Sequence, residues 1–177
     1  VSRLVVSTGN SLHTALASGI LAFGTLHGSA VEDAADFFQK HKDIDNVDEL
    51  VKGLREKKVR VPGYGHKVLE DDPRTESIFT VARQTGIYGA HCRIALRLRD
   101  ALNAVSSKKL PLNVDGALAA VLLDMGFDSK LAKGFFIIGR VPGLVAHIHE
   151  EITTGPGLRR LTEDQTEYVG KQERELL

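Results

Sequence analysis

The sequence has a single cysteine, Cys92, and no excess of charge of either sign, since lysine plus arginine and aspartate plus glutamate number 23 each. One cysteine cannot form a disulfide within the chain, which fits a reducing cytoplasm. The balanced charge provides no general positive field that would favour nucleic acid. Any site that binds an anion must therefore be built from a few local residues.

Long apolar runs and the common cofactor motifs are also missing from the sequence. We find no apolar run long enough to cross a bilayer, so we expect no membrane span. The seven histidines form no HExxH motif, and His147 and His149 would point to different faces of a helix. GYGHKV lacks the third glycine of a dinucleotide-binding loop. We therefore expect no metal site and no tightly bound cofactor.

The chain starts at Val1 without an initiating methionine, and VSRLVVSTGN lacks the layout of a signal peptide. We interpret the sequence as the interior of a longer protein whose amino-terminal part is missing.

Apolar residues recur at helical spacing along most of the chain, and no alternating strand is found, so we predict an all-α fold. Glycines and prolines make residues 59–77 a loop. Pro142 predicts a kink or a junction between helices. The helices are expected over residues 11–23, 29–40, 47–58, 75–83, 89–105, 114–127 and 135–152, with Ser29 capping the second of them.

Three short segments place an ionisable side chain among glycines, prolines or apolar residues. GTLHGSA contains His27, VPGYGHKV contains His66, and LPLNVDGAL contains Asp115. Two imidazoles and one carboxylate make a set for acid–base catalysis. Each also has a structural interpretation, because the histidines can satisfy backbone carbonyls in loops and Asp115 can cap a helix. The segments taken singly leave both interpretations open.

The same segments, in this order, resemble the citrate synthase superfamily. LHGSA is similar to the family's LHGGA, GYGHKVLEDDPR to its GYGH loop followed by DPR, and LNVD to its PNVD; GRVPGLVAHIHEE follows. The resemblance implies an all-helical homodimer with a large domain, a smaller inserted helical domain, and an active site between them that the partner subunit completes. By that resemblance residues 28–120 form the small domain, and residues 1–27 and 121–177 belong to the large domain.

Within the superfamily, LNVDGALAAVLLDMG and GRVPGLVAHIHEE resemble the citryl-CoA lyases and the lyase module of ATP-citrate lyase. His27 is a more synthase-like feature, and Ser29 replaces the second glycine of HGG. The resemblance implies cleavage of citryl-CoA to acetyl-CoA and oxaloacetate. The alternatives are a citrate or methylcitrate synthase that condenses an acyl-CoA with oxaloacetate, and a helical interaction module without catalysis.

The resemblance also implies roles for individual residues. Asp115 exchanges a proton with the methyl carbon of acetyl-CoA, His27 donates to the enolate oxygen, and His66 donates to the oxaloacetate carbonyl. Arginine suits the substrate carboxylates because its planar fork donates two hydrogen bonds. The residues implied for oxaloacetate or citrate are Arg3, Arg74, Arg140 and Phe136, with Arg160, or its neighbour Arg159, delivered across the dimer interface.

Each of these substrate residues also has a simpler interpretation. Arg3 and Arg160 can form surface ion pairs, and Phe136 can be a core residue. Arg140 is surrounded by apolar residues, where a buried arginine needs an anion. Coenzyme A, as a thioester substrate, is implied to contact the loop residues Pro62, Gly63, Tyr64 and Gly65, with Lys67 and Lys109 at its phosphates.

Overall fold

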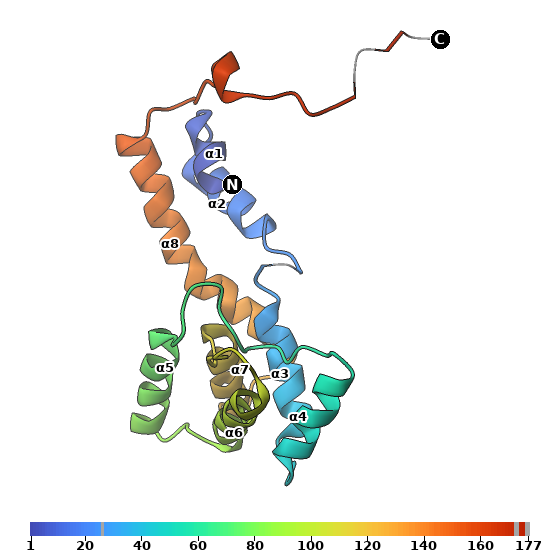
Figure 1. Cartoon of the computed structure of the whole chain (residues 1–177). Helices are drawn as coiled ribbons and strands as arrows, with labels where there is room; N and C mark the ends of the chain where they lie inside the picture. Colours follow the sequence, from blue (N-terminus) through green and yellow to red (C-terminus); the bar gives the residue numbers. More distant parts are fainter. Residues whose placement is uncertain (26, 172–173, 176–177) are drawn as a thin grey trace. The chain divides into compact units, whose positions relative to one another are not determined.

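The computed structural model describes residues 1–25, 27–171 and 174–175, and in these the chain is helical with no strand longer than an isolated bridge. The expected all-α class is confirmed, and Figure 1 shows the succession of helices. Their bounds are α1 Ser2–Ser7, α2 Leu12–Leu21, α3 Ala30–His41, α4 Val47–Glu56, α5 Pro73–Gln84, α6 Ala90–Val105, α7 Val114–Asp124 and α8 Ala132–Thr154, with 3-10 turns η1 Ser129–Leu131 and η2 Glu163–Gln165.

Contacts within the chain define two compact units, residues 1–19 with 143–177 and residues 20–142. The boundaries fall inside α2 and α8, so these two helices contribute to both units. The small domain expected over residues 28–120 follows the domain boundaries of the complete family fold. That boundary stays a prediction.

The core of the unit 20–142 is built around α7, which packs against α3, α5 and α6. α7 is apolar on nearly every side, and Ala117, Ala119 and Ala120 have no exposed surface. Small side chains let the neighbouring helices approach closely, and Phe38 of α3 and Leu98 of α6 are fully buried in the same cluster. A helix buried on all sides fixes the position of its own first turn, which carries Asp115.

Side chains that cap helices explain where several of these helices begin. The side chain of Asn46 accepts a hydrogen bond from the amide of Glu49, as expected at the start of α4. Ser29 stands at the N-cap of α3 as expected, but its hydroxyl does not cap the helix, because it donates to the carbonyl of Gly24 instead.

The first turn of α6 is held from another helix, which the sequence pattern does not predict. The carboxylate of Asp124, at the end of α7, accepts from the amides of Gly89, His91 and Cys92 at 2.8–2.9 Å. It also contacts Nδ1 of His91 at 2.8 Å. This carboxylate therefore ties the end of α7 to the start of α6.

The loop before α5 lies against the first turn of α7 through two glycines. Gly63 has φ +85°, and a Cβ atom there would meet the Cα of Gly116 at 2.8 Å. The carbonyl of Gly63 accepts from the amide of Asn113, and the amide of Gly65 donates to the carbonyl of Pro111. A side chain at Gly63 or at Gly116 would push the loop away from α7. These two glycines therefore set how closely the His66 loop approaches Asp115.

The unit formed by 1–19 and 143–177 has a small core of Val6, Ala15 and Ile148. Glu151, only 3% exposed, is its central charge. Its carboxylate accepts hydrogen bonds from Arg3 Nε and from Arg159 Nη2, each at 2.8 Å. Hydrogen bonds from Arg159 and Arg3 lower the pKa of Glu151 to about 2, so this carboxylate stays ionised at neutral pH.

Helix α8 continues through Pro142, where the sequence predicted a kink or a junction. The helical segment 129–154 is long and apolar enough to cross a membrane by length and composition, which corrects the expectation that no run reaches that length. Only 11% of its most apolar window is buried within the chain. Helices that pack against another protein share these properties, and Arg140 and Pro142 lie in the middle of this one.

We expect Gly63→Ala to lower the free energy of unfolding by about 2–4 kcal/mol, because the new methyl group adds backbone strain to a clash with Gly116. Urea unfolding followed by circular dichroism measures the change. Gly53→Ala is the control, since it lies inside α4 with nothing within 4 Å of its added Cβ. That control should gain about 0.5–1 kcal/mol, and equal effects of the two substitutions would contradict the packing described for Gly63.

Candidate active site

Asp115 lies in the first turn of α7 but does not cap the helix. The cap is Asn113, whose side-chain oxygen accepts from the amides of Asp115 and Gly116 at 3.0 and 3.1 Å. In the described part of the chain, no hydrogen bond or ion pair engages the half-buried carboxylate of Asp115. The capping interpretation of Asp115 is therefore wrong, and its oxygens are available for chemistry.

Burial is the main influence on the acidity of Asp115. It raises the pKa of the carboxyl above its ordinary value, against the lowering effect of the charges on Arg74, His27 and Arg140. The charge of Asp72 raises it further. The groups that influence the pKa of this carboxyl belong to α5, α8 and the turn before α3. A raised pKa brings the titration of this carboxyl closer to neutral pH, which favours a role in proton transfer.

His66 sits in the loop beside the first turn of α7 and is exposed. Its Nδ1 accepts hydrogen bonds from the amides of Val68 and Leu69 at 3.1 and 2.9 Å. The neutral ring therefore carries its proton on Nε2, as assigned from this geometry. The alternative interpretation of His66 as a structural loop residue predicted that its ring donates to backbone carbonyls. The ring instead accepts from backbone amides. These contacts leave the Nε2 hydrogen free to donate to a ligand.

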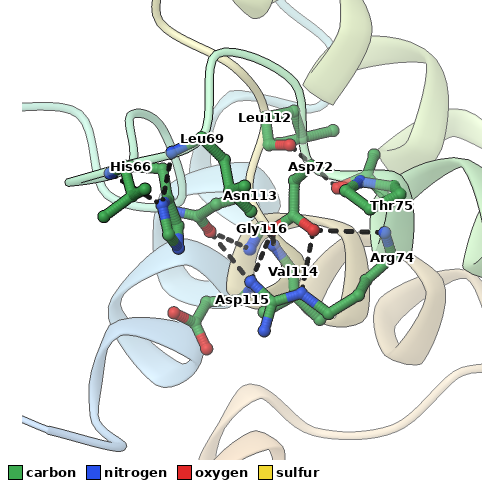
Figure 2. A network of polar contacts seen from close by, with 12 residues as sticks. His66, Leu69, Asp72, Arg74, Thr75, Leu112, Asn113, Val114, Asp115 and Gly116 are labelled. Carbon is green, nitrogen blue, oxygen red and sulfur yellow. Dashed lines mark hydrogen bonds and ion pairs between the residues drawn. The ribbon is translucent and has the colours of Figure 1, made fainter.

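A second link ties the His66 loop to the start of α7. The side-chain amide of Asn113 donates to the carbonyl of Gly65 at 3.0 Å. In Figure 2 the His66 ring and the Asp115 carboxylate both lie at the free edge of the network, away from Thr75 and Leu112. One asparagine thus fixes both the helix start that carries Asp115 and the loop that carries His66.

His27 is held by a tight turn whose amide and carbonyl both pair with Gly24 at 3.0 Å. Its exposed ring lies 5.5 Å from the ring of Phe23 and 6.0 Å from that of Phe136, measured between centroids. Gly28 follows at φ +93°, with Phe136 3.1 Å from the position of an added Cβ. Leu26 of the LHGSA segment lies outside the described residues. The apolar rings orient the imidazole without using its nitrogens.

Two arginines border Asp115. Arg74 opens α5 and binds Asp72, while Arg140 of α8 lies over the Phe136 ring at 5.3 Å from its centroid. Arg140 is exposed, so the expectation that its apolar neighbours bury it is wrong; the described residues leave that face of α8 uncovered. Both guanidinium groups keep donors for an anion.

For the remaining predicted residues the structure gives contacts within each unit. Arg3 and Arg160 belong to the other unit, where Arg3 and Arg159, rather than Arg160, hold Glu151. Arg3 forms ion pairs with Glu150 and Glu151, as the simpler interpretation predicted. Among the loop residues, Lys67 is exposed, Lys109 pairs with Asp71, and Tyr64 is buried with its hydroxyl donating to the Ala95 carbonyl at 2.7 Å.

Sequence reasoning missed Asp72 and Asn113, the two residues that organise the site. Each stands immediately before a helix, and Asp72 is followed by Pro73 at the first helical position. An Asp, Ser, Thr or Asn followed by proline is a signal for the start of a helix, so the Asp72 cap was detectable. Their contacts with a second segment were not. No cluster of metal-ligating side chains is found among the residues that the structure describes.

Known proteins resemble this chain in sequence and in fold. Residues 1–161 match the family described as the C-terminal domain of citrate synthase, and the chain belongs to this family. A solved citryl-CoA lyase from Hydrogenobacter thermophilus is 48% identical with a TM-score of 0.90, over 99% of this chain and 70% of that one.

Two further relatives are more distant. ATP citrate lyase from Methanothrix soehngenii, solved with citrate and coenzyme A, is 26% identical with a TM-score of 0.75, over 97% of this chain and 31% of that one. Citrate synthase 2 of Bacillus subtilis is 29% identical over 96% of this chain and 45% of its own length. The chain thus spans less than half of that synthase.

We expect Asp115→Asn to make the protein more stable at pH 7, because the substitution removes a charge whose burial opposes folding. A carboxyl with a raised pKa in the folded state makes stability fall as the pH rises from the ordinary value of 3.8 through the folded pKa. The gain should therefore be complete above that window and shrink below it. Urea unfolding of both proteins from pH 3 to 8 measures the difference, and a variant less stable than the parent at pH 7 would contradict it.

Proposed function

We propose that this chain is the catalytic part of an enzyme that cleaves citryl-CoA into acetyl-CoA and oxaloacetate. The observation that carries the proposal is the half-buried Asp115 carboxylate, without a hydrogen-bond partner in the described chain and influenced by His27, Arg74 and Arg140. The 48% identity with a citryl-CoA lyase over 99% of the chain supports the lyase among the activities of the family.

In the proposed reaction the bond between the hydroxyl-bearing carbon and the methylene carbon of the thioester breaks. The hydroxyl loses its proton to solvent and becomes the ketone of oxaloacetate, while the bonding electron pair forms the enolate of acetyl-CoA. Asp115 then gives its proton to the enolate carbon, and solvent restores the proton to Asp115. The raised pKa of Asp115 favours the protonated form that this step needs.

Two imidazoles stabilise the charge that moves during this cleavage. His66 donates from Nε2 to the oxygen that becomes the ketone, because its Nδ1 is occupied by two backbone amides. His27 donates to the enolate oxygen. Preformed donors of this kind are worth about 3–4 kcal/mol each in related oxyanion sites. Arg74 and Arg140 bind the substrate carboxylates, and the roles of Arg3 and Arg160 stay predictions from the family resemblance.

Coenzyme A is proposed to bind along the loop of Pro62, Gly63, Tyr64 and Gly65. A cavity of about 400 Å³ adjoins this loop, with Arg55, Lys58 and Arg60 among its lining residues and an apolar floor that includes Val61 and Leu110. Apolar walls with cations at the rim suit an adenine ring bearing phosphates. Lys67 and Lys109 are further candidates for the phosphates.

A citrate synthase, including one that uses longer acyl groups, is the second candidate, and the match to citrate synthase 2 favours it. The same acid–base groups serve both directions of the carbon–carbon step. The difference is whether citryl-CoA is hydrolysed to citrate. A non-catalytic helical module is not favoured, because a carboxylate retained only for structure would be held in an ion pair, and the described residues give Asp115 none.

A homodimer in the cytoplasm is part of the proposal. Helix α8 leaves Ile138 and Ile152 more than half exposed, as are Leu131 and Leu158 beside it. Apolar side chains in such number on one segment are typical of surfaces covered by another protein. A second copy of the chain would cover them and supply Arg159 or Arg160 to the partner's site.

Synthetic citryl-CoA tests the function directly. We expect release of acetyl-CoA and oxaloacetate without free citrate, followed by chromatography and by coupling oxaloacetate to malate dehydrogenase. Asp115→Asn should lower kcat by about 10²–10⁴-fold, because no group remains to transfer the proton. Accumulation of citrate would support the synthase instead, and an unchanged kcat in the variant would exclude Asp115 as the proton-transfer group.

The tautomer of His66 gives a second prediction. His66→Gln places an amide donor near the position of Nε2, whereas His66→Asn places its amide near Nδ1 and leaves the ligand side empty. We expect the glutamine variant to keep about tenfold more kcat than the asparagine variant, since one hydrogen bond to a charged oxygen is worth about 1.5–3 kcal/mol. Steady-state cleavage of citryl-CoA measures both, and an asparagine variant equal to or better than glutamine would contradict donation from Nε2.

A further inference from the structure

Asp72 is a buried carboxylate that the proposed mechanism does not use. It ends the loop before α5, and its side chain has no exposed surface. It stands at the N-cap of α5, where its Oδ1 accepts from the amide of Arg74 at 3.1 Å. A burial this complete normally requires that every oxygen of a carboxylate be paired.

Both oxygens of Asp72 are paired, and with two different segments. Oδ1 also accepts from Arg74 Nε at 2.8 Å, and Oδ2 accepts from Arg74 Nη2 at 2.8 Å and from the amide of Val114 at 2.9 Å. Figure 2 shows the carboxylate between the guanidinium of Arg74 and the first turn of α7. Val114 immediately precedes Asp115.

Capping alone does not account for these contacts. A serine, threonine or asparagine at the N-cap supplies the one oxygen that α5 needs. The paired bonds to the guanidinium and the bond to Val114 are additional, and they connect a predicted substrate arginine to the helix turn that carries the proton-transfer group. An ionised carboxylate is required for all of them together.

We propose that Asp72 is a positioning residue that holds the Arg74 guanidinium and the first turn of α7 in one geometry, so that the carboxylate of the substrate and Asp115 keep a fixed separation. This inference rests on the proposed function, in which Arg74 binds a substrate carboxylate and Asp115 transfers a proton. Because a small displacement of reacting groups lowers the rate strongly, fixing the separation favours catalysis.

The charges around Asp115 give a consequence that a purely structural cap would not have. Arg74 of α5, Arg140 of α8 and His27 lower the pKa of Asp115, while the charge of Asp72 raises it. Hydrogen bonds from Arg74 hold the pKa of Asp72 below its ordinary value, so Asp72 remains ionised. Loss of the Asp72 charge therefore removes a raising influence and leaves the positive charge of Arg74 unopposed. The pKa of Asp115 should fall.

Asp72→Asn in the full chain tests the inference, because asparagine can still cap α5 but cannot accept from both Arg74 Nη2 and Val114. We expect kcat for citryl-CoA cleavage to fall by about 10- to 100-fold and KM to rise. Arg74→Gln and the double variant complete a cycle, in which the effect of Asp72→Asn on KM should largely disappear once Arg74 is absent. Additive effects on KM would overturn the proposal.

Asn46→Ala is the matched control for lost stability, since Asn46 caps α4 in the same unit through a 3.1 Å bond and contacts no site residue. It should leave kcat and KM unchanged. If Asp72→Asn does not fold, Asp72→Ser keeps the cap oxygen and removes the charge. A kinetic effect of either Asp72 variant no larger than that of the control would overturn the proposal.

A titration separates this inference from the proposed function. The carboxyl carbon of Asp115, assigned by comparison with Asp115→Asn, is followed by NMR against pH in the parent and in Asp72→Asn. We expect its midpoint to move to lower pH in the variant. Absence of citryl-CoA turnover in the parent would reject the proposed function alone, whereas an unmoved midpoint would reject the role of Asp72 whether or not turnover is seen.

Discussion

The candidate site depends on the close contact between the loop of residues 62–66 and the first turn of α7. Gly63 and Gly116 bring the two backbones together, and Asn113 bonds to both segments. The contact fixes His66 relative to Asp115, although 49 positions of sequence separate them. Backbone atoms meeting backbone atoms leave little freedom, so this junction is stiffer than one made by long side chains.

Helix α7 serves the fold and the site in opposite ways. Its alanines and leucines fill the core, which anchors the helix firmly. The same anchoring holds the Asp115 carboxylate where burial raises its pKa, which opposes folding at neutral pH. A group that costs stability where it stands, with no structural partner to compensate, is typical of a residue kept for chemistry.

Both units hold arginine against a buried carboxylate. Asp72 binds Arg74 in one unit, and Glu151 binds Arg3 and Arg159 in the other. In each case the acid lies almost wholly buried while the arginine is about half exposed. The pairing orders a long side chain in advance, which reduces the entropy lost when an anion binds.

The sequence by itself determined the helices and the identity of the reactive groups. Apolar spacing located α3, α4, α6 and α7, because helical periodicity is a local property of the chain. The motifs around His27, His66 and Asp115 indicated the family, since each keeps a reactive side chain beside glycine, proline or a helix start. Asn46 was a recognisable cap for the same local reason.

Only the tertiary structure decided how these groups are used. The packed structure determines the tautomer of His66 and pairs Asp72 with both Arg74 and Val114. It also places Asp124 at the first turn of α6, where it accepts from backbone amides. Arg140 is exposed, although its apolar neighbours in sequence suggested burial. These features join residues that are distant in sequence or depend on which helix face the rest of the chain covers. Local patterns record backbone preference, whereas such contacts exist only after the helices have packed.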